Sequence, residues 1–244
     1  MSGEARSLGG IYGKVPAFAD FVHRRLPMSF VEPWNAWLRR SIAASRQHIP
    51  DSWNDAYLTS PVWRFALDPD VAGPVGWLGV LASSVDEMRR SYPITVAISL
   101  PEDTFLFDLG NDLEAFFAAL EKIALQLIDG TWTPDAATTG LEKLADILPD
   151  FASAGALLSR GTYERLHIGT AYGSVAAMRA HLGNELGRRF DDGVRLSGWW
   201  HGGWNASPPV SLMTVGLPSP DIFASFLDGS WRDRGWSDCE GSAP

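Results

Sequence analysis

Three short runs of branched and aromatic residues, each bounded by proline, glycine or aspartate, constrain the fold of this chain more than any other feature. They cover residues 62–67, 75–83 and 94–100. Side chains of these types favour the pleated strand. The connection between the first two runs, DPDVAGP at 68–74, is short and turn-like, as an antiparallel hairpin requires. The runs therefore predict three strands, the first two of them antiparallel neighbours.

Amphipathic helices are predicted before and after these strands in the sequence. The clearest covers 29–49, where apolar and small residues recur with a spacing of about 3.6 residues. The members of this stripe are Phe30, Trp34, Trp37, Leu38, Ser41, Ile42, Ser45 and Ile49. Its start is ambiguous, because Ser29 and Glu32 resemble a capping box whereas Pro33 favours the first helical turn. Further helices are predicted at 113–127, about 139–148, 174–190 and 219–229, and further strands at 9–15, 194–200 and 210–217.

This order of elements predicts an α/β sandwich, in which helices cover a central sheet that is mostly antiparallel. No shift in composition marks a linker, so residues 1–244 are expected to form a single domain. Its core is expected at about 8–229, and the polar residues 230–244 are expected to form a flexible tail.

Charge and composition exclude several classes of protein. A net charge of −9 argues against a nucleic-acid partner, which requires a surplus of lysine and arginine. No apolar run approaches the roughly 18–20 residues of a membrane span, and the first residues lack the apolar stretch of a secretory signal. The single cysteine, Cys239, cannot form an internal disulfide. We expect a cytoplasmic protein that does not insert into a membrane.

The usual signatures of catalysis and metal binding are absent from the sequence. There is no HExxH, CxxC or GxSxG motif, and the glycines at 9–14 do not have the spacing of a phosphate loop. The five histidines include no i, i+4 pair, so no metal ion or other cofactor is predicted. A site assembled in space from Asp20, His23, Asp86 and His201 remains open at this stage.

Eleven tryptophans are present, and their positions suggest different roles. Trp34 and Trp37 belong to the core stripe of the first helix. Trp63 and Arg64 are neighbours on a strand and are expected to point to opposite faces of the sheet. By the same rule Trp199, Trp200 and Trp204 cannot all face one core, so at least one of them is expected at the surface. The polar segment 84–93 is a second candidate site.

Three separated stretches resemble the TagF family, also called ImpM, which comprises accessory proteins of bacterial type VI secretion. They are GKVPAFADFVHRRLPMSFVEPWNAWL at 13–38, YLTSPVWRFAL at 57–67 and GWLGVLASSVDEMRRSYPITVAISLP at 76–101, with a weaker echo in SGWW at 197–200. The chain departs from the family pattern at three places. Ala19 replaces a glycine, Asn35 replaces an aspartate, and Arg89-Arg90 stands where the family has a glycine–arginine pair.

The resemblance implies a cytoplasmic regulator that is not an enzyme. TagF-type proteins act as post-translational repressors of the secretion machine and are linked to its forkhead-associated scaffold protein, which is therefore the implied partner. The surface expected to bind this partner combines charged residues of the N-terminal half with outlying tryptophans. It comprises Asp20, Arg24, Arg25, Arg64, Asp86, Arg89, Arg90, Trp200 and Trp204.

Three alternatives stay open on the sequence. Asp20 and Arg64 are equally consistent with a structural ion pair that fixes the N-terminal strand to the sheet. Asp20, Asp86 and Arg64, with a histidine, are also compatible with a divergent hydrolase or nucleotide-binding enzyme. A structural subunit of the secretion baseplate is the third possibility.

Overall fold

A computed structural model describes residues 8–101, 104, 113–145, 166–168, 195–203, 210–234 and 237–238 of the chain. Its strands are β1 (Gly9–Gly13), β2 (Val22–Arg24), β3 (Trp63–Leu67), β4 (Trp77–Ala82), β5 (Ile94–Ser99), β6 (Leu166–Ile168), β7 (Leu196–His201), β8 (Val210–Val215) and β9 (Ser237–Asp238). Its α-helices are α1 (Met28–His48), α2 (Trp53–Leu58), α3 (Glu114–Ile128), α4 (Pro134–Ala145) and α6 (Ser225–Asp228). Two 3-10 helices, η5 (Pro220–Ile222) and η6 (Arg232–Arg234), flank the last of these.

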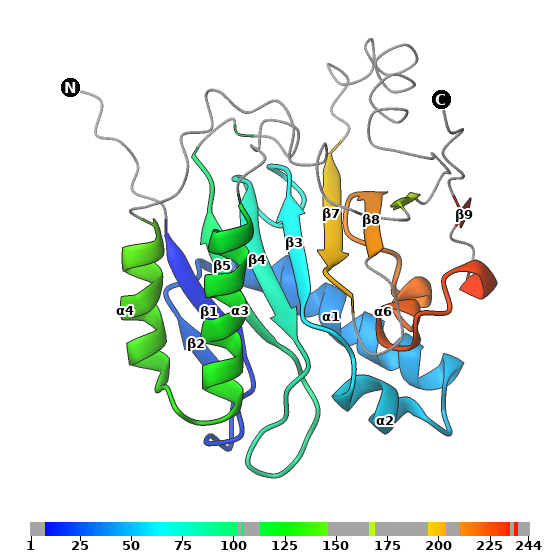
Figure 1. The fold of residues 1–244 in the computed structure, drawn as a ribbon, viewed down its shortest axis with the longest axis horizontal. Coiled ribbons are helices and arrows are strands. Elements are labelled where there is room, and N and C mark those ends of the chain that lie inside the picture. Colours follow the sequence, from blue (N-terminus) through cyan, green and yellow to red (C-terminus); the bar gives the residue numbers. More distant parts are fainter. Residues whose placement is uncertain are drawn as a thin grey trace.

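The described strands form one sheet in the order β2-β1-β5-β4-β3-β7-β8-β6-β9 (Figure 1). Neighbouring strands are antiparallel except β6 and β8, which are parallel. The predicted hairpin is confirmed, with Trp63 opposite Leu81 and Leu67 opposite Trp77. The α/β class with a mostly antiparallel central sheet is therefore confirmed.

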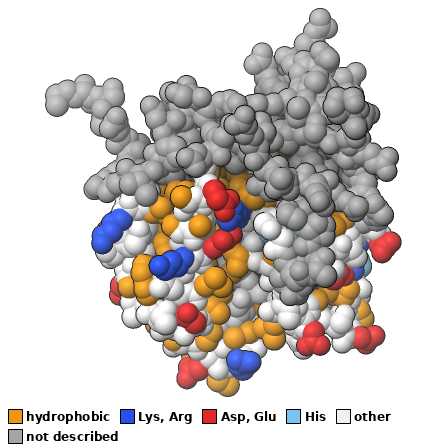
Figure 2. Space-filling model, in the orientation of Figure 1, with side chains coloured by type: hydrophobic (Ala, Val, Ile, Leu, Met, Phe, Trp, Pro, Cys, Tyr) orange, Lys and Arg blue, Asp and Glu red, His pale blue; other side chains and the backbone are white. Residues whose placement is uncertain are grey.

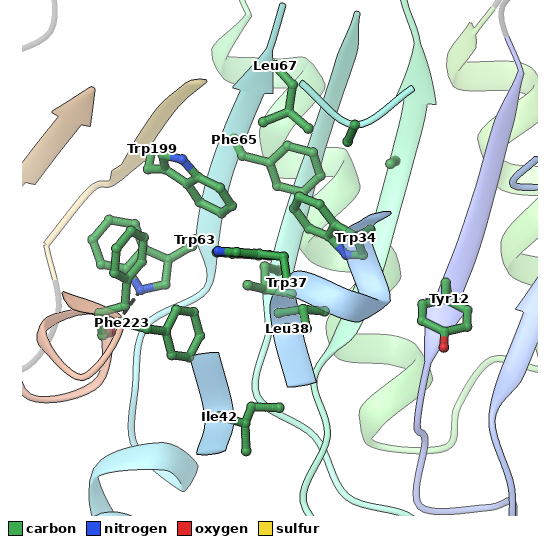
Figure 3. Close-up of a cluster of buried hydrophobic side chains, with 14 of the residues drawn as sticks. Tyr12, Trp34, Trp37, Leu38, Ile42, Trp63, Phe65, Leu67, Trp199 and Phe223 are labelled. Carbon is green, nitrogen blue, oxygen red and sulfur yellow. Dashed lines mark hydrogen bonds between the residues drawn. The ribbon is translucent and has the colours of Figure 1, made fainter. Parts of the chain in front are cut away.

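One face of the sheet packs against α1, α2 and α6. The stripe predicted on the first helix is buried here, and Trp34 lies against Phe65 of β3 and Trp199 of β7 (Figure 3). The indole N–H groups of this helix find partners: Trp34 Nε1 donates to Thr95 Oγ1 and Trp37 Nε1 donates to the Pro218 carbonyl. Aromatic rings at these separations stabilise one another beyond the area that they bury.

The opposite face packs against α3 and α4, which lie in front of the sheet in Figure 1. Phe117, Leu120 and Leu127 of α3 and Leu141 of α4 are buried against alternate residues of β4 and β5. The outer surface of these helices carries charged side chains of both signs among apolar ones (Figure 2). Because helices cover both faces, most residues of the central strands are buried whichever way they point.

Several local predictions need correction. Helix α1 begins after Pro27 and has no side-chain cap, so the proposed capping box is wrong, and Pro33 lies inside the helix. Helix α4 begins at Pro134, earlier than predicted. Strand β2 was not predicted, because three residues are too few to show the alternation of apolar and polar side chains that indicates a strand. The final helix is split into η5 and α6. Ser219 precedes it but forms no side-chain cap, whereas Gly229 ends it as predicted, in the left-handed conformation. The helix predicted at 174–190 lies outside the described residues.

A membrane-spanning helix is not found in the part of the chain that the structure describes, since every helix there is too short or too polar.

Candidate functional site

Two loops at the lower end of the sheet in Figure 1 lie side by side and form the candidate site. One joins β1 to β2 and the other joins β4 to β5. The Glu87 N–H donates to the Phe18 carbonyl at 3.0 Å, and Arg90 Nη2 donates to the Ala19 carbonyl at 2.7 Å. We call residues 17–21 and 86–90 the two-loop ledge. It brings together four of the residues predicted to bind a partner, Asp20, Asp86, Arg89 and Arg90.

A buried carboxylate fixes the ledge to the sheet. Asp86 has no exposed surface, and its Oδ2 accepts hydrogen bonds from Lys14 Nζ at 2.8 Å and Arg90 Nε at 2.7 Å. Its Oδ1 accepts the Arg90 N–H at 2.8 Å. Burial alone would raise the pKa of Asp86, but the hydrogen bonds from Lys14 and Arg90 outweigh it and hold the pKa well below its usual range. The carboxyl group is therefore an ionised structural anchor.

The loop from β4 to β5 is a tight hairpin closed around this anchor. The Asp86 N–H donates to the Arg90 carbonyl, and the Arg89 N–H donates to the Asp86 carbonyl at 2.9 Å. Arg89 has a φ of 62°, in the left-handed region that usually holds glycine or asparagine. The glycine that the family pattern has at this position would adopt that conformation without strain. Here the same turn instead presents a long cationic side chain to solvent.

Three rings join the ledge to helix α1. Phe21 stacks on Tyr12 with ring centroids 5.6 Å apart and meets Tyr92 edge-on at 4.7 Å. The Tyr92 hydroxyl donates to Asn35 Oδ1 of α1 at 2.8 Å. Burial raises the pKa of Tyr92, so its hydroxyl stays protonated and keeps this donor role. The Lys14 ammonium group lies 5.3 Å from the Phe21 ring centroid, a favourable cation–π distance.

The ledge exposes an unusual amount of apolar surface. Phe18 is 39% exposed, Phe21 is 40% exposed and Met88 is 69% exposed. All three were missed in the prediction of the site, which considered charged residues and tryptophans only. The signal available in the sequence was the presence of large apolar residues within two otherwise polar, turn-forming segments.

Arg24 and Arg25 point away from the ledge and bind helix α4. Arg24 Nε lies 3.0 Å from Asp135 Oδ1, and Arg25 Nη1 contacts Glu142 Oε1. Both pairs are solvent-exposed and contribute little to stability. These two arginines belong to the junction of the edge strand with α4, rather than to the ledge.

The predicted ion pair between Asp20 and Arg64 is wrong. Arg64 is buried on the face covered by α3, where Nη1 and Nη2 bind both oxygens of Glu114 and Nε binds Glu121 at 2.7 Å. Asp20 is exposed, and its carboxylate accepts the N–H of Phe21 at 2.7 Å. Hydrogen bonds from Arg64 lower the pKa of Glu114. Arg64 therefore fixes α3 to the sheet and does not face a partner.

Trp199 and Trp200 are both buried, so the prediction of Trp200 as an outlying anchor is wrong. The two rings do point to opposite faces, but helices cover both faces. Trp199 packs against Trp34, and Trp200 packs edge-on against Phe117 of α3 with centroids 4.8 Å apart. Trp200, 5% exposed, is therefore a core residue and cannot be an anchor at the surface. Trp204 lies outside the described residues.

The possible cluster of Asp20, His23, Asp86 and His201 does not form a metal site. Within the described segments, no group of three histidine, cysteine or acidic side chains is placed to hold a metal ion. His201 is buried at the end of β7, where its ring meets Trp63 edge-on and Nδ1 accepts the Gly203 N–H. Asp86, Arg64 and Asp20 each bind different partners, so the arrangement proposed for a divergent hydrolase is not present among them.

Comparison with known proteins places the chain in a family. A family model described as the TagF N-terminal domain, type VI secretion system-associated, matches residues 10–144, and this range includes the whole ledge. The crystal structure of PA0076 from Pseudomonas aeruginosa PAO1 is similar, with a TM-score of 0.66 and 32% sequence identity over 91% of this chain and 94% of that one. Among curated proteins, none matches the chain. The chain belongs to the TagF family of proteins associated with type VI secretion.

Proposed function

We propose that this protein is a non-enzymatic cytoplasmic regulator that represses type VI secretion by binding a component of the machine, the forkhead-associated scaffold, through the two-loop ledge. Family membership supports the link to secretion. The ledge supports a binding role, and it is the observation that carries this proposal.

The ledge has the properties of a binding hot spot. Phe18, Phe21 and Met88 are large, apolar and exposed, and interfaces are enriched in aromatic residues, methionine and arginine. Their backbone is held from three directions. Asp86 binds Lys14, which directly follows β1; the Tyr57 hydroxyl of α2 donates to the Ser84 carbonyl at 2.8 Å; and Tyr92 binds Asn35 of α1. A surface ordered before it meets its partner loses little conformational entropy on binding.

The charged groups of the ledge hold its two loops in place. The Asp86 carboxylate is saturated by one ammonium group, one guanidinium group and one backbone N–H. Such a saturated group suits a scaffold better than a general base, which requires a free lone pair near the substrate.

The binding role is tested with the purified chain and the full-length forkhead-associated scaffold of its own secretion cluster, by titration calorimetry. The double variant Phe18→Ser/Met88→Ser is expected to weaken binding at least about tenfold, because it removes the exposed anchors without touching the Asp86 network. The matched control is Leu125→Ser, which removes an exposed apolar side chain of α3. Absence of binding by the wild-type chain would refute this partner.

The direction of regulation requires a second measurement. Deletion of the gene is expected to raise secretion from an otherwise intact cluster, and the wild-type chain is expected to restore repression. The Phe18→Ser/Met88→Ser variant, expressed at equal level, is expected not to restore it. A fall in secretion upon deletion would show that the protein assists the machine instead of repressing it.

A further inference from the structure

The charge around the ledge differs in sign from that of the whole chain. Together with Lys14 and the nearby Arg39 of α1, the ledge has four basic residues, Lys14, Arg39, Arg89 and Arg90, and three acidic ones, Asp20, Asp86 and Glu87. The chain as a whole has a net charge of −9. A local positive surplus on an acidic protein gives the ledge an electrostatic preference that the rest of the surface does not share.

Two of these cations have no acidic partner among the described residues. Lys14 and Arg90 are bound to Asp86, whereas the structure shows no ion pair for Arg39 or Arg89 within its described segments. Asp20 forms no ion pair with either of them within the described segments, and its carboxylate instead accepts the N–H of Phe21. Both free guanidinium groups are exposed and available to a ligand.

Arg39 lies beside the rings that support Phe21. It follows Asn35 by one helical turn, and Asn35 accepts the hydrogen bond from the Tyr92 hydroxyl. Its positive charge acts on both tyrosines and lowers the pKa of Tyr12 and of Tyr92, against the larger effect of burial, which raises them. The guanidinium group of Arg39 therefore lies on the side of these rings that faces α1.

Arg89 stands on the other loop, next to the exposed Met88. Its left-handed backbone conformation is strained for a residue with a Cβ, compared with the ordinary right-handed region. No hydrogen bond or ion pair of its side chain within the described structure offsets that strain. A residue with a strained backbone, whose side chain forms no hydrogen bond or ion pair within the described structure, is a candidate for a contact with another molecule.

We propose that the two-loop ledge recognises an acidic segment of its protein partner, in which one or more aspartate or glutamate carboxylates adjoin a large apolar side chain. This inference rests on the binding role proposed above and specifies its chemistry. The apolar side chain packs against Phe18, Phe21 and Met88, and carboxylates bind Arg89 and Arg39 from either side. Guanidinium groups pair with carboxylates through two parallel hydrogen bonds, which gives orientation as well as attraction.

The test uses the full-length chain and the full-length forkhead-associated scaffold, with a photo-crosslinking amino acid at position 88. The matched control carries the same crosslinker at position 125, an exposed apolar position on α3. Position 88 is expected to crosslink to a scaffold peptide with aspartate or glutamate within about three residues of the attachment point. A neutral or basic peptide at position 88, or equal crosslinking from position 125, would overturn the inference.

Charge variants provide an independent measurement. Arg89→Glu is expected to weaken the scaffold's binding about tenfold or more and to flatten its salt dependence. Arg89→Gly separates charge from backbone strain and is expected to weaken binding by a smaller factor. Lys143→Glu, a charge reversal at an exposed position of α4, is the matched control and is expected to bind as the wild type does. Unchanged affinity in both Arg89 variants would overturn the inference.

A charge swap tests direct contact between Arg89 and the acidic residue. Replacement of that residue in the crosslinked segment by lysine is expected to restore affinity for the Arg89→Glu chain. Failure to restore affinity would contradict a direct contact. The two proposals fail differently. Binding that depends on Phe18 and Met88 but not on Arg89 or Arg39 leaves the regulator role standing and refutes the acidic segment. Absence of binding by the wild-type chain refutes both.

Discussion

The ammonium group of Lys14 lies 2.8 Å from the carboxylate of Asp86, and the two residues are 72 positions apart in the sequence. This pair joins the end of the first strand to the loop between β4 and β5. Both groups are buried, so the Lys14 charge depends on Asp86 for compensation, while Asp86 also binds Arg90. The Lys14 ammonium group also lies 5.3 Å from the ring centroid of Phe21, so the pair contacts both loops of the ledge and helps to set their relative position.

Asp86→Asn is expected to lower the melting temperature by about 10 °C, because it leaves the Lys14 ammonium group buried without its counter-charge. Amide exchange within residues 84–92 is expected to accelerate in the same variant. The comparison is with Asp20→Asn, which alters an exposed carboxylate and should melt within about 2 °C of the wild type. Equal melting of the two variants would contradict the anchoring role of Asp86.

The stabilisation by Asp86 is expected to be lost in acid. Because its pKa is lower in the folded state than its ordinary value of 3.8, this contribution is complete above that value. It declines as the pH falls from there toward the pKa of the folded state. Between pH 5 and about pH 2, the free energy of unfolding measured with urea should therefore fall more steeply with decreasing pH for the wild type than for Asp86→Asn. Parallel curves would show that Asp86 is not the titrating group.

Arg89→Gly is expected to stabilise the protein by about 0.5–1 kcal/mol. Glycine adopts the observed φ without a clash, and the gain is reduced by the greater freedom of glycine in the unfolded chain. Arg89→Ala, which keeps a Cβ, serves as the control and should bring no gain. The measurement is equilibrium urea unfolding, and an equal gain in both variants would assign the effect to charge.

Arg64→Met is expected to destabilise the protein by about 2–3 kcal/mol. The expected loss is below that of a fully buried pair, because the Glu114 side chain is 72% exposed and regains water. The triple variant Arg64→Met/Glu114→Gln/Glu121→Gln removes the repulsion between the abandoned carboxylates and should recover part of the loss. Additive losses, measured by urea unfolding, would contradict a coupled cluster.

His201 is expected to make stability depend on pH between about 6.5 and 4. Burial lowers its pKa to about 4 from an ordinary value of 6.5, so the neutral ring is the folded form. Its contribution is complete above pH 6.5 and declines as the pH falls, by at most about 1.4 kcal/mol per pH unit. His201→Phe retains an aromatic ring against Trp63 and should flatten this dependence. If the free energy of unfolding, measured with urea, depended on pH equally in His201→Phe and the wild type, another group would be responsible for the pH dependence.

The local patterns in the sequence sufficed for most elements in the described part of the chain. The stripe from Phe30 to Ser45 predicts α1 because its period is about that of a helix, and a short turn-forming segment before Trp77 predicts the hairpin. Opposite faces for Trp63 and Arg64 also follow from strand geometry alone, and the structure confirms them. These features depend on residues close together in the chain, so local patterns encode them.

The candidate site was predicted only in part, because it depends on contacts between residues that are far apart in the sequence. Asp20, Asp86, Arg89 and Arg90 were placed correctly in two polar loops, but their partners were not, since Lys14 lies 72 residues from Asp86. The exposed Phe18, Phe21 and Met88 were missed, because a large apolar residue in a loop is buried or exposed according to what packs on it.

The sequence by itself determined six of the described strands, the first helix, the antiparallel hairpin of β3 and β4, and the membership of a family. Only the tertiary structure decided which charges pair and which rings are buried. Arg64 binds Glu114, 50 residues away, because α3 covers that face of the sheet, and Trp200 is buried for the same reason. Pairing and burial are properties of the assembled layers, and an alternating pattern within one strand does not specify which layers cover it.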